Sequence, residues 1–169
     1  DIAYMEMTEY VEVPKGDYNF QVVPNGATEP VVIDADLKLK AFRDYTVVAV
    51  DYLDSIMPIV LEDNRLKVPP KRSKIRFVHA SPDAPAVDIA IKGGPVIFEE
   101  YSFAQSSKYM MVQPGEYDLE VRVAGTDIVA LDIPVVTLAE NTAYTAFAVG
   151  ELADESLTAM LVEDRMRIN

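Results

Sequence analysis

The sequence repeats itself at an offset of 99 residues, and this repeat limits the folds that the chain can adopt. YVEVPKGDYNFQVVPNG, from Tyr10, aligns without gaps to YMMVQPGEYDLEVRVAG, from Tyr109. Eleven of the 41 positions from 10 to 50 are identical, and they fall on turn glycines and on apolar residues typical of strands. Such self-similarity indicates a tandem duplication of one structural unit. We therefore expect two copies of the same domain.

The first copy is shorter than the second. At the offset of 99, Asp1 aligns with Glu100, so the first copy has no counterpart of Ser73–Glu99. We expect the first copy to lack its opening strands, and the sequence to be a fragment of a longer precursor. The expected domains are a truncated first repeat at 1–68, a linker at 69–72 and a complete second repeat at 73–169. One inserted residue after position 50 would align Leu61 with Leu161 and Arg65 with Arg165.

The local pattern within each copy is that of short strands joined by tight turns. In YDLEVRVAG, apolar and polar residues alternate with a period of two, which is typical of a half-buried strand. PKGD and QPGE precede these strands with the Pro and Gly of tight turns. RDYTVVAVD and TAYTAFAVG are rich in β-branched and aromatic residues, as central strands are. The pattern predicts an all-β chain of two tandem Ig-like β-sandwich domains.

Composition excludes several classes of function. The net charge is −13, so phosphate backbones would be repelled and nucleic acid is not an expected partner. The chain has no cysteine, which excludes disulfides, thiol nucleophiles and thiolate metal sites. No apolar run approaches the roughly 20 residues needed to cross a bilayer. We expect no membrane span in this chain.

The stretch IRFVHASPDAPAVDIAI contains the only histidine, His79. Pro82 and Pro85 each fix a φ angle, and Asp83 can close a turn on its own backbone, so the stretch predicts a rigid corner between two strands. Ser81 lies in the same corner, on a Ser-Pro turn that lacks the Gly-x-Ser-x-Gly pattern of a nucleophile elbow. We expect His79 to be buried and hydrogen-bonded within this corner, to Asp83 or Asp88. The alternative is a metal site built from the side chains His79, Asp83 and Asp88. A single histidine among carboxylates would suit calcium better than zinc.

Repeated tyrosines raise the question of ligand binding. Tyr18 and Tyr117 follow a Pro-Gly-type turn at the start of a strand, as does the tyrosine corner of Ig-type sandwiches, where the hydroxyl binds a backbone group. Five others are candidates for exposed aromatic platforms that hold a sugar ring or a protein partner: Tyr4, Tyr10, Tyr52, Tyr101 and Tyr109.

Three segments carry a family resemblance: IRFVHASPDAPAVDIAI, YMMVQPGEYDLEVRVAGT and YTAFAVG. Together they resemble domain of unknown function 4397, a family of secreted and cell-envelope proteins of bacteria and archaea in which the domain often occurs in tandem. The likeness spans 73 to about 165 fully, and 1 to about 68 in a version without the HASPDAP strands. The resemblance implies an Ig-like β-sandwich and an extracytoplasmic location, and it supplies no catalytic residues.

These observations lead to a non-enzymatic extracytoplasmic protein that acts as a spacer or as an adhesion or binding module. The alternative is a carbohydrate- or calcium-binding domain, and a third hypothesis is a carboxylate-dependent glycan hydrolase. No cofactor is expected except, under the alternative, calcium. An incomplete sandwich has an open sheet edge, which invites pairing with another strand. We expect a protein or cell-surface glycan as partner, with the first copy completed by self-association or by a strand from elsewhere.

Overall fold

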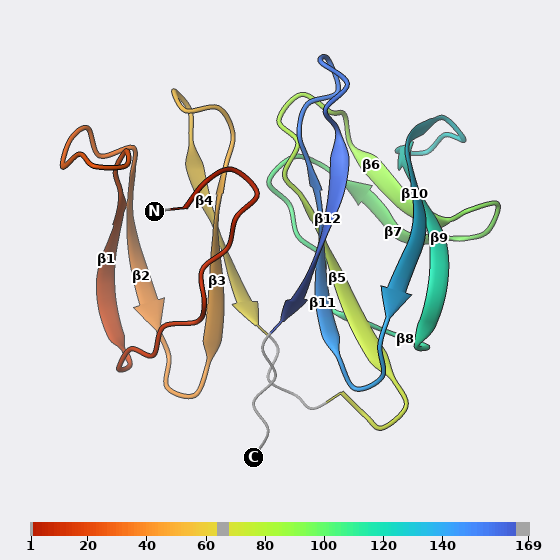
Figure 1. The fold of residues 1–169 in the computed structure, drawn as a ribbon, viewed down its shortest axis with the longest axis horizontal. Helices are drawn as coiled ribbons and strands as arrows, with labels where there is room; N and C mark the ends of the chain where they lie inside the picture. Colours follow the sequence, from red (N-terminus) through yellow and green to blue (C-terminus); the bar gives the residue numbers. More distant parts are fainter. Residues whose placement is uncertain (1, 64–67, 165–169) are drawn as a thin grey trace. The chain divides into compact units, whose positions relative to one another are not determined.

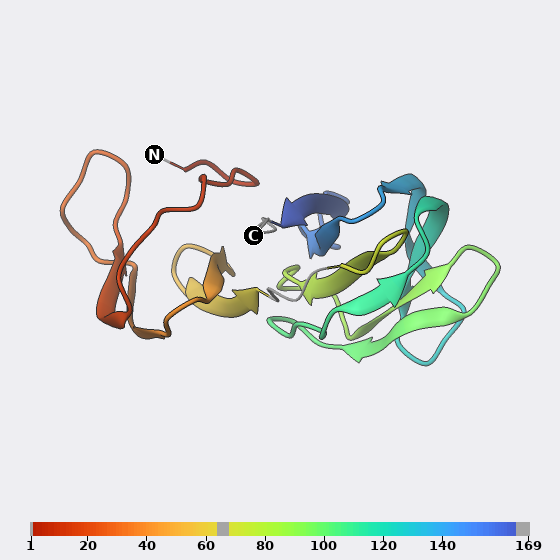
Figure 2. The same cartoon turned by 90° about the horizontal axis from the view of Figure 1, so that it is seen from below.

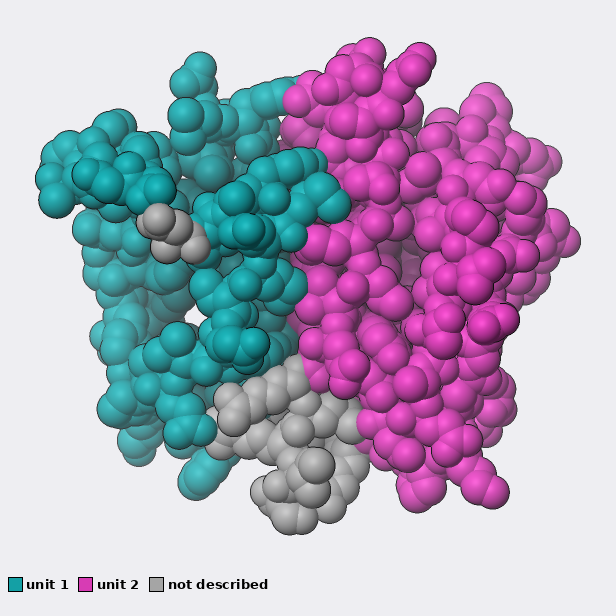
Figure 3. Space-filling view, viewed as in Figure 1, with its two compact units in different colours: residues 1–65 teal, residues 66–169 magenta. Residues whose placement is uncertain are grey.

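The computed structural model describes residues 2–63 and 68–164 and is all-β over those residues, with twelve strands in four sheets (Figure 1). The chain divides into two compact units, residues 1–65 (unit 1) and residues 66–169 (unit 2) (Figure 3). The prediction of two tandem β-sandwich domains, the first without its opening strands, is confirmed. The expected linker, 69–72, belongs to unit 2, where the carbonyl of Arg72 accepts the backbone N–H of Asn141.

Unit 1 consists of two hairpins, each a two-stranded antiparallel sheet. The first hairpin pairs β1 (Gly16–Val22) with β2 (Ile33–Leu39), and the second pairs β3 (Asp44–Val50) with β4 (Met57–Asp63). Among the described residues, β1 pairs only with β2, and β3 pairs only with β4. β1 and β3 therefore each have one edge without a partner strand.

Unit 2 is a complete sandwich of two four-stranded sheets, which Figure 2 shows as two layers. Its strands are β5 (Ser73–His79), β6 (Val87–Ile91), β7 (Val96–Tyr101), β8 (Met110–Val112), β9 (Gly115–Val123), β10 (Val129–Leu138), β11 (Ala143–Val149) and β12 (Thr158–Asp164). One sheet has the order β10-β9-β6-β7 and the other β12-β11-β5-β8. β5 runs parallel to β11 and antiparallel to β8.

The hydrophobic core of unit 2 depends on the strands around the HASPDAP stretch. Half of the ten residues in its central cluster come from β5, β6 and β7: Ile75, Phe77, Val87, Ile89 and Phe98. The other half come from the later elements: Val121, Leu138, Tyr144, Ala148 and Leu157. Because apolar area removed from water is the main stabilising term in folding, β5 to β7 are needed for a complete core.

The hairpins of unit 1 correspond to the last two hairpins of unit 2: β1–β2 to β9–β10, and β3–β4 to β11–β12. The correspondence extends to backbone conformation, since the turns contain left-handed residues at aligned positions: Gly26 and Gly125, Phe42 and Asn141, Asp51 and Gly150. Aligned sequences therefore fold into the same local structures in both units.

Strand pairing corrects the sequence alignment in the last strand of each copy. Asp63 pairs with Asp44, whereas Asp164 pairs with Ala143. Because Asp44 aligns with Ala143, the structural counterpart of Asp63 is Asp164, and the offset in this strand is 101. The expected match of Leu61 with Leu161 is therefore wrong by one residue. The expected match of Arg65 with Arg165 lies outside the described residues.

Candidate functional site

His79 ends β5, and its side chain is completely buried. Its Nε2 lies 3.0 Å from the carbonyl oxygen of Pro85, and its Nδ1 lies 3.4 Å from the backbone N–H of Ser81. Both contacts are satisfied by the neutral imidazole that carries its proton on Nε2. Burial lowers the pKa of His79, which also favours the neutral form. The ring thus holds the two sides of the corner together.

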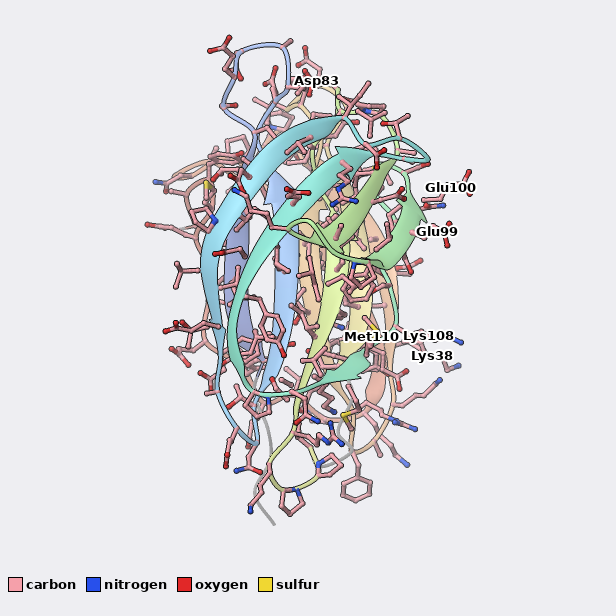
Figure 4. The ribbon with its side chains drawn as sticks, turned by 90° about the vertical axis from the view of Figure 1, so that its right-hand side faces the viewer. Lys38, Asp83, Glu99, Glu100, Lys108 and Met110 are labelled. Atoms are coloured by element: carbon pink, nitrogen blue, oxygen red, sulfur yellow. The ribbon has the colours of Figure 1, made fainter. Side chains whose placement is uncertain are left out.

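Asp83 fixes the corner to the loop between β11 and β12. Its two carboxylate oxygens accept the backbone N–H groups of Leu152 and Ala153, at 2.7 and 2.8 Å. These hydrogen bonds lower the pKa of Asp83, with the bond from Leu152 contributing most. The Ser81 hydroxyl also lies 3.4 Å from the Asp83 carboxylate. Figure 4 labels Asp83 at this end of the sandwich.

Asp88, on β6, joins three elements of its sheet. One carboxylate oxygen accepts the backbone N–H of Glu100 on β7 at 2.7 Å, and the other accepts the N–H of Gly125, in the β9–β10 turn, at 2.9 Å. The Glu100 side chain itself is exposed (Figure 4). Asp88 is buried, so these bonds compensate the cost of removing its charge from water.

The structure does not bring His79, Asp83 and Asp88 together as metal ligands. Each side chain binds backbone groups of a different neighbour, and no three His, Cys, Asp or Glu side chains in the described part of the chain form a metal-binding cluster. The arrangement that the three residues do form is a scaffold for the corner.

Tyr18 and Tyr117 have the geometry of a tyrosine corner. Tyr18 donates its hydroxyl to the carbonyl of Pro14, and Tyr117 donates to that of Gln113, both at 2.7 Å and both across four residues. A second pair repeats in the same way, since the hydroxyls of Tyr45 and Tyr144 accept the N–H groups of the residues five positions earlier. These tyrosines stabilise the turns of both units.

Tyr109 belongs to a polar cluster on the face of the β11 sheet opposite to the hydrophobic core. Its hydroxyl donates to Asp164 at 2.7 Å, and Thr145 donates to the same carboxylate at 2.8 Å. Arg76 of β5 joins the cluster through a 2.7 Å bond from Nε to Thr145 and an ion pair of 3.6 Å with Asp164. The guanidinium also lies 4.7 Å from the centre of the Tyr109 ring, within reach of a cation–π interaction.

Unit 1 contains the same cluster. Tyr10 donates its hydroxyl to Asp63 at 2.8 Å and lies 3.3 Å from Thr46, and Thr46 donates to Asp63 at 2.9 Å. The identities of the two tyrosines and the two threonines were visible in the repeat. The carboxylates were missed because the sequence alignment of the last strand was one residue off.

The five tyrosines proposed as exposed platforms have different environments. Tyr10 and Tyr109 are partly buried in the clusters just described. Tyr101 packs edge-on against Phe77 and Phe98 of the core, with ring centres 5.8 and 6.2 Å apart, and is therefore not an exposed platform. Tyr52, in the β3–β4 loop, is 47% exposed, and Tyr4 is 72% exposed.

Aligned core-facing residues are buried in unit 2 and more exposed in unit 1. Tyr144 and Ala148 are 7% and 2% exposed, whereas Tyr45 is only partly buried and Ala49 is exposed. On the other sheet, Val121 is 1% exposed and its counterpart Val22 is partly buried. The residues that differ are those that β5 and β6 contact in unit 2. This open side of unit 1 is the candidate functional site.

None of the elements in the described part of the chain is a helix capable of crossing a membrane. The chain is similar to a solved structure of the C-terminal domain of AlgF from P. aeruginosa, with 17% identity and a TM-score of 0.42. That match covers 56% of this chain and 99% of the AlgF domain. No curated protein matches the sequence.

A family model matches almost the whole chain, in two segments, residues 1–90 and 91–168. The boundary between the matches falls at the end of β6 and so does not coincide with the boundary between the compact units. The first match thus combines unit 1 with β5 and β6. The chain belongs to the family described as DUF4397, a domain of unknown function.

Proposed function

We propose that this protein is a non-enzymatic module that acts outside the cytoplasm, as a spacer or by binding another macromolecule. One observation supports the proposal most: the polar side chains that the two units share hold the scaffold together. The tyrosine corners, the hydroxyls at positions 45 and 144 and the two Tyr–Thr–Asp clusters all bind groups of the chain itself. The polar residues that both copies retain are therefore residues that stabilise the fold.

The polar residues of the HASPDAP corner favour the same conclusion. His79 and Asp88 are buried and bind backbone groups on both sides, and Asp83 holds two backbone N–H groups. Every buried side-chain nitrogen and oxygen in the described residues has a hydrogen-bond partner. General acid–base chemistry needs a pair of titratable groups that converge on a substrate, and this corner offers its groups to the backbone instead.

The proposal is tested by turnover on a panel of polysaccharides, measured as release of reducing sugar by the full chain. We expect no release above that of a heat-denatured sample. Release that disappears in Asp83→Asn and persists in the turn variant Asp154→Asn would contradict a non-enzymatic role. The acidic loops contain exposed carboxylates in both units, and calorimetric titration of the same sample with calcium chloride tests the calcium-binding alternative. We expect no heat of binding, and a saturable heat would favour that alternative.

The carbohydrate-binding alternative is favoured by one feature, the exposed residue Tyr52 between two acidic neighbours. It lies in a loop between Asp51 and Asp54, and aromatic rings beside carboxylates are suited to stacking on sugars. A glycan array separates the two functions. Hits that Tyr52→Ala removes and that Leu53→Ala, at an exposed neighbour in the same loop, leaves in place would replace the proposed role with carbohydrate binding.

A further inference from the structure

We propose that unit 1 binds a separate β-strand pair with the sequence chemistry of β5–β6, one that is not already folded into a sandwich. This inference rests on the proposed binding role and names its partner. The bound pair would place one strand beside β3, in parallel, and the other beside β1, antiparallel, as β5 and β6 lie beside β11 and β9 in unit 2.

The first argument is the strand register, which unit 2 defines residue by residue. Arg76 pairs with Thr145, and Ile89 pairs with Val121. The aligned positions on unit 1 are Thr46 on β3 and Val22 on β1. Neither strand has a second partner strand within the described residues, and an unpaired strand edge is a template for a further strand.

The second argument is the apolar surface that such a pair would cover. Ala148 is 2% exposed beside β5, and the identical Ala49 is exposed. Leu161, on β12, which does not pair with β5, is 39% exposed, and its counterpart Val60 is 42% exposed. The exposure of aligned residues therefore differs between the units at the position beside the bound strand, and it is similar at a position that this strand would not pair with.

The third argument concerns the segment that flanks β5 on its other side in unit 2. There the backbone of residues 104–107 binds Phe77 and His79, and β8 pairs with the start of β5. Unit 1 keeps the same local turn, because Glu6 binds the carbonyl of Ala3 as Gln105 binds that of Ser102. The residues that align with β8, 11–13, form no strand in unit 1. A bound strand would give them the partner that β5 gives to β8.

The fourth argument is the Tyr10–Thr46–Asp63 cluster. In unit 2 the same arrangement of tyrosine, threonine and aspartate receives Arg76 from β5. Because Thr46 aligns with Thr145, an arginine at the Arg76 position of the bound strand would lie beside Thr46, as Arg76 lies beside Thr145 in unit 2. The cluster thus predicts a basic residue at this position of the partner and fixes the register of binding.

A separate strand pair fits this site better than a second copy of the chain. In each copy β5 and β6 are central strands of unit 2 and supply four residues of its core: Ile75, Phe77, Val87 and Ile89. Their transfer to a neighbouring molecule would expose that core, and the new contacts with unit 1 would at best offset the free energy lost there. A strand pair that is not already folded into a sandwich has no such cost.

The test uses the full chain and a fluorescently labelled peptide of residues 73–91 as the probe. We expect saturable binding by anisotropy, together with slower amide exchange at 11–13 and along β1 and β3. Ala49→Glu should weaken binding by about tenfold or more, because this exposed position would become buried against the strand. The matched control Val60→Glu, on the neighbouring strand β4, should leave binding unchanged.

The remaining outcomes are equally decisive. Binding that survives Ala49→Glu, or protection that appears in unit 2 alone, would overturn the proposal. Equal affinity for a peptide with Arg76→Glu would overturn the assigned register. A dimer that Ala49→Glu abolishes, without peptide binding, would assign the open edge to a second copy instead. Each of these results leaves the polysaccharide turnover assay unaffected, so failure of strand binding and failure of the non-enzymatic role are distinguishable.

Discussion

Units 1 and 2 share their hairpins but differ in the burial of the same side chains. Tyr45 and Tyr144 are identical, occupy the same place in their strands and bind the same kind of backbone group. Tyr144 is nevertheless buried in a core to which β5, β6 and β7 contribute half of the cluster, and Tyr45 is only partly buried. Local sequence is thus sufficient to form the hairpins. Burial of their inner faces requires strands from elsewhere in the sequence.

The largest expected effect comes from truncating this pair of tyrosines. Tyr144→Ala removes a buried aromatic ring and should lower the free energy of unfolding of unit 2 by about 3–5 kcal/mol. Tyr45→Ala should cost unit 1 less than about 2 kcal/mol, because part of that ring is already in water. Amide exchange in increasing urea reports β3 and β11 separately. Equal costs in the two units would contradict the difference in burial.

Asp88→Asn tests the hydrogen bonds that Asp88 makes from β6 in unit 2. Within the described residues, unit 1 has no strand that corresponds to β6, so it has no equivalent bonds. The amide can accept one of the two N–H groups that the carboxylate holds, so unit 2 should lose about 2 kcal/mol and unit 1 should be unaffected. Urea unfolding followed strand by strand checks this result. A loss in β1–β4 as well would mean that the two units do not unfold independently.

Removing the tyrosine-corner hydroxyls should affect the units alike. Tyr18→Phe and Tyr117→Phe each delete one hydrogen bond across four residues, worth about 0.5–1 kcal/mol at an exposed position. The bond is local to the turn, and β5 to β7 take no part in it. A cost confined to Tyr117→Phe would show that even the hairpins depend on a complete sandwich.

The smallest expected effect is a pH dependence that belongs to unit 2. The pKa of His79 is lowered by burial from its ordinary value of 6.5. Below pH 6.5 the unfolded chain therefore binds more protons than the folded chain, so stability should fall as the pH drops through this window and stay level above it. Thermal unfolding of unit 2, followed at β11 between pH 7.5 and 5.5, measures how steeply its stability depends on pH. His79→Gln should remove this dependence. A slope that persists in the variant must come from another group.

The parts of the fold that depend on residues close together in the sequence could be predicted from it. Pro-Gly turns and alternation at Tyr117 predicted the hairpins, and the offset of 99 predicted two copies with strands missing from the first. The pairing of β5 with β11 joins residues about 70 positions apart, and no local pattern encodes it. For the same reason the partners of Tyr109 and Asp88 were not predicted, and aromatic platforms and a metal site were considered for residues that stabilise the fold.

The central claim is that β3 has an open edge where β11 pairs with β5. Amide exchange resolved by NMR, on dilute full chain, tests it most directly. The alternate amides of β3 that do not donate to β4 should exchange at nearly unprotected rates, while the aligned amides of β11 exchange slowly. Equal protection of β3 and β11, independent of protein concentration, would show that unit 1 closes on its own and would contradict the claim.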